Sequence, residues 1–212
     1  FPDPSESKYP INAISFRLNE NDVEHIYLLK IDNHIDPKID DIVKSGKYPT
    51  LTLFTSEYTM ICAFLEYIRK TDPDFICGWN SSYFDFPYII GRMRKLNIPM
   101  KNLSPFGNVY AGNNGKVIMT GYVPLDQLTL YKDQNQTKLP SYSLDAVAKE
   151  ENVGEKTPYD GNLNTLYNDN IDKFIEYSLN DTFLIKGIED KTQHISIQDE
   201  LRRISTNSHS GA

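Results

Sequence analysis

Hydrophobic residues along the chain follow two patterns, one typical of β-strands and the other of α-helices. Residues 11–18 and 25–31 are rich in β-branched and aromatic residues and flank a polar turn, which predicts an antiparallel hairpin. Residues 50–54 predict a short strand. Residues 75–79 are almost wholly apolar, as expected for a strand at the centre of a sheet covered on both faces. The polar stretch 32–49 predicts irregular structure.

Helical spacing appears in the longer segments between and after these strands. Ser56 is the expected N-cap of the first helix, and Asp72-Pro73 is its expected end. The predicted helices cover residues 56–70, about 87–98, 123–132, 141–151 and a long run from 170 that continues to about 205. A further hairpin is predicted over 108–122, with its tip at Gly112–Gly115. Alternating strands and helices predict an α/β sandwich.

The composition suits one globular domain with a substantial core, or one large domain with a tail. The chain has 212 residues, of which 39% are hydrophobic. It contains no apolar stretch of 18 residues, so no membrane-spanning segment is expected. The chain shows no signal peptide and begins without methionine, which suggests a fragment. Cys62 and Cys77 lie in apolar runs and are interpreted as reduced core residues of an intracellular protein, with a disulfide or a metal pair as the alternative.

The charge of the chain limits how it could bind nucleic acid. Its net charge is −7, from 22 basic and 29 acidic residues. Proteins that wrap nucleic acid by charge usually carry basic patches, so this balance argues against that class. It does not exclude an enzyme that holds metal ions with carboxylates and gains its grip on DNA from neighbouring domains.

Three side chains are candidates for chemistry. Asp85 follows the strand 75–79 and precedes a helix, and ligands bind at the carboxyl ends of strands in open α/β sheets. Its alternative role is to cap that helix. Tyr177 and Asp181 are spaced i and i+4, so they share one face of the long helix. Their alternative interpretation is a surface aspartate beside a tyrosine at the edge of the core.

The joint pattern of three segments points to a known family. "GWNSSYFD" (78–85), "PSYSLDAVA" (140–148) and "YSLND" (177–181) occur in this order. Together they resemble the 3′–5′ proofreading exonuclease domain of B-family DNA polymerases, especially those of large tailed bacteriophages. Asn80, Phe84 and Asp85 match the family's second exonuclease motif, Asn-x-x-x-Phe-Asp. Tyr177 and Asp181 match the third, Tyr-x-x-x-Asp.

The resemblance implies a fold and a domain organisation. The fold is RNase H-like, an α/β fold with a mixed central sheet flanked by helices. Residues 1–212 would form a single exonuclease domain, with about 190–212 as a helical extension toward the polymerase domain. The family's first motif, Asp-x-Glu on the first strand, has no match in the chain and is expected before Phe1. The fragment would then lack its first strand, expose the apolar segment 75–79 and have little nuclease activity by itself.

The resemblance also implies a metal site. Two divalent ions, Mg²⁺ or Mn²⁺, would activate a water molecule and neutralise the leaving 3′ oxygen, and such ions prefer carboxylate oxygens. Asp181 would help to hold one ion and Asp85 the other. Tyr177 would orient the attacking water through its hydroxyl group.

The remaining implied roles concern DNA. Asn80 and Phe84 would line the pocket for the terminal nucleotide, with simple core filling as the alternative for Phe84. Lys156 lies in a loop, 153–161, that resembles the loop before the family's last helix. Phe1 aligns near an aromatic residue that stacks on the single strand in the phage relatives, with disorder of the chain terminus as the alternative. The hairpin around Asn113 corresponds to one that helps to separate primer from template.

The sequence therefore predicts the proofreading exonuclease domain of a DNA polymerase, which removes mispaired 3′ nucleotides by two-metal-ion hydrolysis. Its expected partners are the single-stranded 3′ end of the primer and the remaining polymerase domains of the same parent chain. No association with a membrane is expected. Its expected location is the cytoplasm of a phage-infected bacterium. Two alternatives stay open: a non-catalytic exonuclease-like module that binds single-stranded DNA or braces a polymerase, and a free-standing exonuclease.

Overall fold

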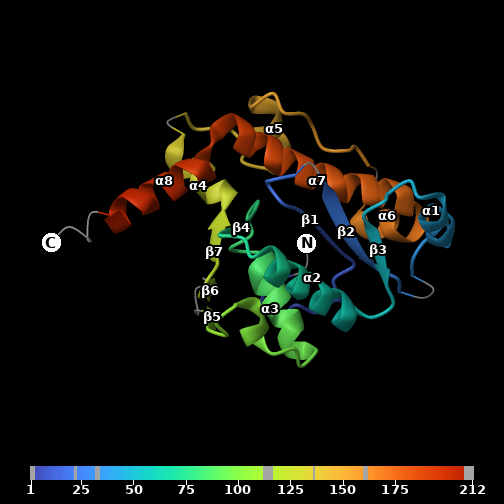
Figure 1. Ribbon diagram of the computed structural model, residues 1–212. Helices are drawn as coiled ribbons and strands as arrows, with labels where there is room; N and C mark the ends of the chain where they lie inside the picture. The colour runs from blue at the N-terminus through green and yellow to red at the C-terminus, as the bar shows by residue number, and fades with distance from the viewer. Residues whose placement is uncertain are drawn as a thin grey trace.

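Seven strands in the described part of the chain pair into three small sheets (Figure 1). The computed structural model describes residues 3–21, 23–31, 34–111, 117–135, 137–159 and 162–207. The strands are β1 (Ala13–Arg17), β2 (Glu24–Leu29), β3 (Leu51–Phe54), β4 (Phe75–Gly78), β5 (Val109–Ala111), β6 (Val117–Met119) and β7 (Val123–Asp126). β1 pairs with β2 in the antiparallel sense and β2 with β3 in parallel, so the first sheet is mixed. β4 and β7 form a parallel pair, and β5 and β6 an antiparallel one.

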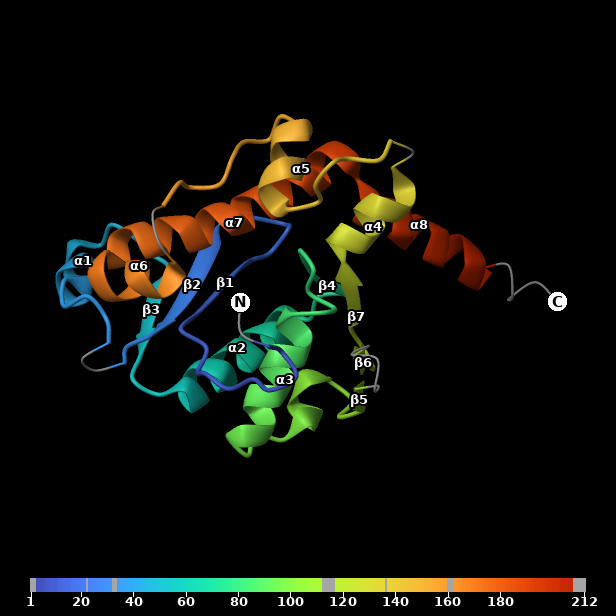
Figure 2. The same cartoon turned by 180° about the vertical axis from the view of Figure 1, so that it is seen from behind.

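Helices surround these sheets. The helical elements are α1 (Ile39–Ser45), α2 (Glu57–Thr71), α3 (Asp85–Lys95), the 3₁₀ turn η1 (Met100–Leu103), α4 (Gln127–Gln134), α5 (Leu144–Glu150), α6 (Leu163–Asp169), α7 (Ile171–Thr192) and α8 (His194–Asn207). Figure 2 shows α7 extending along the mixed sheet, with α2 and α3 on the opposite side. The predicted α/β class with a mixed sheet flanked by helices is confirmed.

Alternation along β2 separates the two layers of the core. Ile26 and Leu28 are fully buried and pack in one cluster with Ile171 and Ile175 of α7. The intervening Tyr27 belongs instead to an aromatic group on the other face. In that group Phe16 contacts Tyr27 and two aromatic residues of α2, Phe64 and Tyr67. The strand therefore joins α7 on one face to α2 on the other, as the period-2 geometry of a strand requires.

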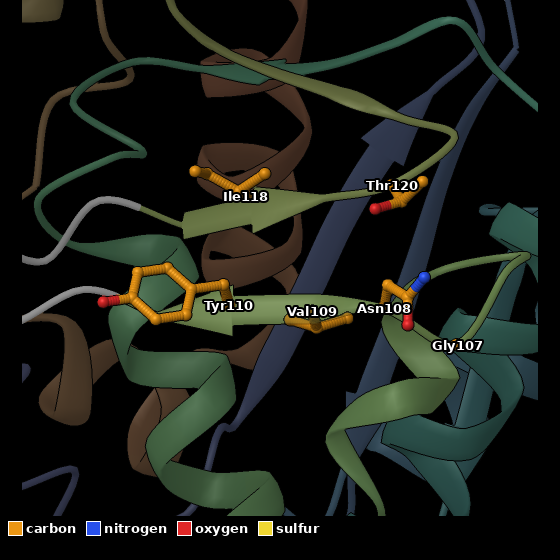
Figure 3. Close-up of a pocket in the computed structure, with 6 residues that line it drawn as sticks. All are labelled: Gly107, Asn108, Val109, Tyr110, Ile118 and Thr120. Carbon is orange, nitrogen blue, oxygen red and sulfur yellow. The ribbon is translucent and has the colours of Figure 1, made fainter.

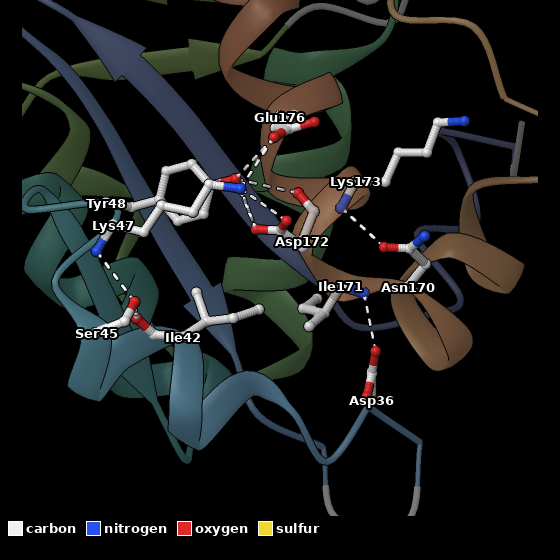
Figure 4. Close-up of polar contacts among 10 residues, drawn as sticks. All are labelled: Asp36, Ile42, Ser45, Lys47, Tyr48, Asn170, Ile171, Asp172, Lys173 and Glu176. Atoms are coloured by element: carbon white, nitrogen blue, oxygen red, sulfur yellow. Dashed lines mark hydrogen bonds and ion pairs between the residues drawn. The ribbon is translucent and has the colours of Figure 1, made fainter.

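Polar contacts fix the start of α7 against the preceding half of the chain (Figure 4). The Lys47 ammonium group lies 2.7 Å from an Asp172 carboxylate oxygen and 3.1 Å from that of Glu176. The Tyr48 hydroxyl donates to Asp172 over 2.8 Å. Asp36 accepts a hydrogen bond from the Ile171 backbone N–H, and the Asn170 side chain accepts one from the Lys173 N–H. The Asp36 and Asn170 contacts satisfy backbone N–H groups of the first helical turn, which have no partner within the helix. The Lys47 and Tyr48 contacts tie the side chains of that end of α7 to the loop before β3.

The N-terminal segment 3–11 is held on α2 and α3 by a buried ion pair. The Arg92 guanidinium lies 2.5 Å from Glu57 and also donates to the backbone oxygen of Ser7 over 3.0 Å. Glu57 accepts a further bond from the Ile11 N–H over 2.8 Å. Because each charge has several partners, the pair can be buried without an unsatisfied group.

Several local predictions were wrong. Residues 39–45 and 163–169 form the helices α1 and α6, although the first stretch was predicted as irregular and the second was not assigned to a helix. Residues 123–126 form the strand β7, not the start of a helix. The predicted N-cap position of Ser56 on α2 is confirmed, although its side chain makes no capping hydrogen bond.

The prediction for residues 75–79 also needs correction. Among the described residues β4 pairs only with β7, so it is not a central strand there. Cys77 is exposed and Cys62 is partly buried, and both are free thiols. The interpretation of Cys77 as a core residue was therefore wrong. The apolar character of residues 75–79 predicts a strand covered on both faces, whereas Cys77 is accessible to solvent in the described part of the chain.

No helix in the described ranges is both long and apolar enough to cross a membrane.

Candidate functional site

Asp85 sits where β4 ends and α3 begins. The turn between them passes through Asn80, whose φ of 62° lies in the left-handed region that asparagine tolerates. The backbone N–H groups of Tyr83 and Phe84 both donate to the Asn80 carbonyl, which closes the turn. Phe84 occupies the N-cap position, and Asp85 lies in the first helical turn. Asp85 is therefore not the N-cap residue, although its charge suits the positive end of the helix dipole.

The environment of Asp85 disfavours its ionised form. Desolvation by the surrounding protein raises its pKa to about 6, and the negative charge of Asp126 contributes to the shift. The residue is nevertheless exposed to solvent, so that hydration of the carboxylate offsets part of this effect. A carboxylate in such a position is stabilised by any cation that binds it.

Asp126 is a neighbouring acid that sequence reasoning missed. It is buried at the carboxyl end of β7, where it pairs in register with Gly78 at the end of β4. Its side chain accepts hydrogen bonds from the backbone N–H groups of Ser82, over 2.9 Å, and Thr129, over 3.1 Å. Asp126 thereby ties the turn before Asp85 to the start of α4. A strand that ends on an acidic residue is the sequence signal that could have identified Asp126. It was missed because residues 123–132 were predicted as a helix.

A second group of side chains surrounds Asp181 on α7. Tyr177 and Asp181 share one face of the helix, and Lys156 reaches both from the preceding loop. The Lys156 ammonium group donates to the Tyr177 hydroxyl over 2.9 Å and to an Asp181 carboxylate oxygen over 2.8 Å. Tyr177 is buried, and the Tyr159 ring packs edge-on against it at a centroid distance of 5.1 Å. The structure thus brings together three predicted site residues that are up to 25 positions apart.

Burial and charge act in opposite directions in this group. Desolvation raises the pKa of Asp181, and Lys156 offsets only part of that effect. Desolvation also raises the pKa of Tyr177, so its hydroxyl stays protonated at neutral pH. Burial lowers the pKa of Lys156, but its hydrogen bonds to Asp181 and Tyr177 outweigh this and the net shift is upward. The group therefore combines a carboxylate, an ammonium and a neutral phenol.

A depression of about 330 Å³ adjoins the same loop. Its lining residues are Asp145, Lys149, Glu155, Lys156, Thr157, Pro158 and Tyr159. A smaller pocket of about 250 Å³ lies at the hairpin β5–β6 (Figure 3). Its lining residues are Gly107, Asn108, Val109, Tyr110, Ile118 and Thr120. Only the first depression includes a predicted site residue, Lys156.

The other predicted site residues lie in separate places. Asn80 forms the turn described above, and the Phe84 ring stacks on Tyr88 at 5.8 Å. Phe1 and the hairpin tip at Asn113 lie outside the described residues. Among the described side chains, no hydrogen bond or ion pair joins Asp85 to Asp181, and no three acidic, histidine or cysteine residues form a metal-binding group. A shared site for the two acids stays a prediction.

Asp181 nevertheless fits a cation ligand. One of its carboxylate oxygens accepts from Lys156, whereas the other is buried and has no hydrogen-bond partner. A buried carboxylate oxygen without a donor is costly, and a hard divalent cation is the kind of group that would satisfy it. The donor set at Asp181 and Asp85 consists of oxygen atoms, as Mg²⁺ and Mn²⁺ prefer.

Comparison with known proteins identifies the family. The family model described as "DNA polymerase family B, exonuclease domain" matches residues 1–147 of this chain, and the chain belongs to that family. The match includes Asn80, Phe84 and Asp85, so the predicted resemblance is confirmed.

Relatives in phages and animal viruses extend the similarity. The chain is 30% identical to the DNA-directed DNA polymerase of Enterobacteria phage T4, and the match covers 89% of this chain and 24% of that protein. It is 29% identical to that of Escherichia phage RB69, with 93% and 24% covered. It is 33% identical to the DNA polymerase catalytic subunit of Equine herpesvirus 1 (strain Ab4p), with 65% and 12% covered. The chain thus spans about a quarter of the length of the phage relatives.

Proposed function

We propose that this chain supplies the site at which a DNA polymerase removes mispaired nucleotides from the 3′ end of a primer. The observation that carries the proposal is the contact group of Lys156, Tyr177 and Asp181 in a family B exonuclease domain. An isolated Tyr-x-x-x-Asp on a helix carries little information. A buried tyrosine and a carboxylate with one unpartnered oxygen, joined by a lysine, form an arrangement suited to phosphodiester hydrolysis.

Asp181 and Asp85 would hold the divalent cations that the reaction requires. When bound, Mg²⁺ or Mn²⁺ would lower the pKa of the attacking water and offset the charge on the leaving 3′ oxygen. The carboxylate of Asp181 is positioned for this role by α7, whose start is anchored by Lys47 and Asp36. Asp85 is positioned by the turn that Asp126 fixes through the Ser82 N–H.

Tyr177 and Lys156 would act on the water and the phosphate by hydrogen bonding. The Tyr177 hydroxyl is protonated at neutral pH, so it orients a water molecule rather than accepting a proton from it. Lys156 carries a positive charge, and electrostatic stabilisation of the charge that develops on a phosphoryl oxygen suits an ammonium group.

The substrate would be a frayed, single-stranded primer end. Asn80 and Phe84 lie next to Asp85 in sequence and would contact the terminal nucleotide, and Phe1 would stack on a base further along the strand. The remaining domains of the polymerase would supply most of the grip on DNA, because the net charge of this chain is −7. As in a phage system, the reaction would take place in the cytoplasm of the infected bacterium.

The domain would extend through α8 toward the rest of the polymerase. α8 is separated from α7 at Gln193, whose φ of 52° ends the long helix. Ile197, Leu201 and Ile204 are exposed along α8 at helical spacing, which suits a surface that other domains cover.

The test is an excision assay on the full-length polymerase that contains this chain, called the intact protein below. Its substrate is a primer that carries a mismatched 3′ nucleotide. With Mg²⁺ the protein should release nucleoside monophosphates, and Asp181→Ala should reduce the rate by about 1,000-fold or more. Asp190→Ala is the matched control, since Asp190 lies on the same helix, is exposed and pairs with Lys186 away from the site. Equal excision by wild type and Asp181→Ala would overturn the proposal. Tight binding of single-stranded DNA without excision would favour the non-catalytic module.

A further inference from the structure

The peptide bond between Glu155 and Lys156 is held by side chains of two different helices. The Lys156 backbone N–H donates to the Asp145 carboxylate over 2.8 Å. The Glu155 carbonyl of the same peptide unit accepts from the Asn180 side-chain amide over 2.9 Å. Both polar groups of one peptide plane are therefore satisfied by side chains in an otherwise irregular loop.

The two helices that supply these side chains form a fixed base. Asp145 lies in the first turn of α5, and Asn180 lies on α7 next to Asp181. Val147 and Ala148 of α5 are fully buried in one cluster with Leu184 and Ile188 of α7. Close packing of this kind leaves little freedom for one helix to move against the other. The separation between the two holding side chains is thus set by the core.

Orientation of the peptide determines where the Lys156 side chain begins. The lysine side chain has several rotatable bonds and would otherwise sample many positions. With its backbone fixed, its ammonium group reaches the Tyr177 hydroxyl and the Asp181 carboxylate at 2.9 and 2.8 Å. A displacement of about 1 Å at a reacting group can change a rate by as much as about 100-fold.

We propose that Asp145 and Asn180 are positioning residues of the exonuclease site, which act by holding the Glu155–Lys156 peptide and thereby aiming Lys156 at Tyr177 and Asp181. This inference rests on the proposed function. Among the described residues, neither side chain forms a hydrogen bond with Tyr177 or Asp181. The negative charge of Asp145 also contributes to the raised pKa of Asp181, an effect that Asp145→Asn removes while it keeps an acceptor for the Lys156 N–H. Both residues lie within segments that carry the family resemblance, but neither is one of the acid or tyrosine positions to which that resemblance assigns a role.

The Asp145 carboxylate has a second partner, and the two interactions can be separated. Its other oxygen pairs with the Lys149 ammonium over 2.9 Å, one turn along α5. Asp145→Asn keeps an oxygen that can accept from the Lys156 N–H but removes the charge that attracts Lys149. Lys149→Ala removes this ion pair and a longer one to the Glu155 side chain at 3.5 Å, and leaves the contact between Asp145 and the Lys156 N–H. Asp145→Ala removes both.

The experiment is a set of double-mutant cycles in the intact protein, read by single-turnover excision and by the melting temperature. In the wild-type background, Asp145→Ala and Asn180→Ala should each slow excision by about 10-fold. In the Lys156→Ala background, the same substitutions should change the rate by less than about 2-fold, since they act through Lys156. Asp145→Asn and Lys149→Ala should stay within about 3-fold of wild type.

Amide hydrogen exchange gives a readout that does not depend on activity. The Lys156 amide should exchange faster in Asp145→Ala than in wild type or Lys149→Ala, because it loses its acceptor. A wild-type protein without excision would refute the proposed function. Two other outcomes, each with normal excision by the wild-type protein, would refute the positioning role alone. In the first, Asp145→Ala and Asn180→Ala slow excision equally in the wild-type and Lys156→Ala backgrounds. In the second, Asp145→Ala does not slow excision at all. If Asp145→Ala fails to fold, the rates of Asn180→Ala in the two backgrounds decide the question.

Discussion

The carboxylate of Asp85 is held in a state that costs the folded protein stability. Its pKa is raised from 3.8 to about 6, mainly by desolvation, with a contribution from Asp126. An acid with a raised pKa binds its proton more tightly in the folded protein than in the unfolded chain. Stability should therefore fall as the pH rises from about 4 to about 6. A charge that is unfavourable for folding is expected where a cation binds.

Replacement of this charge gives a prediction at the residue scale. Asp85→Asn should raise the melting temperature at pH 7 in EDTA, and the gain should disappear as the pH is lowered to about 4, where both side chains are neutral. Solvent exposure of Asp85 limits the gain to a few degrees. Thermal unfolding at a series of pH values measures it. Asp133→Asn, which removes an exposed charge on α4, is the control. If the melting temperatures of both variants changed with pH in the same way, the raised pKa of Asp85 would not be the cause of the gain.

Tyr177 and Asp181 should differ in how much each contributes to excision. Tyr177→Phe removes one orienting hydroxyl group, a loss of about 1–3 kcal/mol or about 10- to 100-fold in rate. Asp181→Ala should cost more, because it removes a charge partner of the cation. Single-turnover excision ranks the two variants, and Mn²⁺ affinity should fall only for Asp181→Ala. If Tyr177→Phe excised nucleotides as fast as the wild-type protein, Tyr177 would contribute to core packing and not to the reaction.

At the scale of elements, α3 connects the N-terminal segment to the turn that carries Asp85. Arg92 and Tyr88 contact the segment around Ser7 and Tyr9, and the Tyr88 ring stacks on Phe84 next to Asp85. The stripes of α2 and α7 and the strands β1 to β3 were predictable, because apolar periodicity specifies them directly. α1 and α6 were not, since each is only seven residues long and depends on its packing beside α7.

The buried Arg92–Glu57 pair gives a prediction for this element. Glu57→Gln leaves a buried guanidinium without its charge partner and should reduce the free energy of unfolding by about 3–5 kcal/mol. Chemical denaturation measures the change. The double variant Glu57→Gln/Arg92→Met should be less destabilised than the single variant, because no uncompensated charge remains. If the two variants are equally unstable, the ion pair is not what holds segment 3–11 in place.

At the scale of the whole molecule, the candidate site has two parts that the sequence places 96 positions apart (181 − 85). One part comprises Asp85 at the start of α3 and Asp126 at the end of β7, and the other comprises Lys156, Tyr177 and Asp181. The motifs identified Asp85, Tyr177 and Asp181 because their spacing is a property of the sequence. They could not reveal Asp126, Asp145 or Asn180, whose contacts depend on strand pairing and on a loop meeting two helices.

The central claim is that Asp85 and Asp181 act together in one metal-dependent nuclease site. Single-turnover excision of a mismatched 3′ nucleotide by the intact protein, with Mg²⁺, tests it through Asp85→Ala, Asp181→Ala and the double variant. Substitutions of groups that act as a unit have strongly non-additive effects on the rate. Each single substitution should therefore lower the excision rate by about 1,000-fold or more. The rate of the double variant should lie within about 3-fold of the rate of either single variant. Excision at the wild-type rate in either single variant, or losses that multiply in the double variant, would contradict the claim.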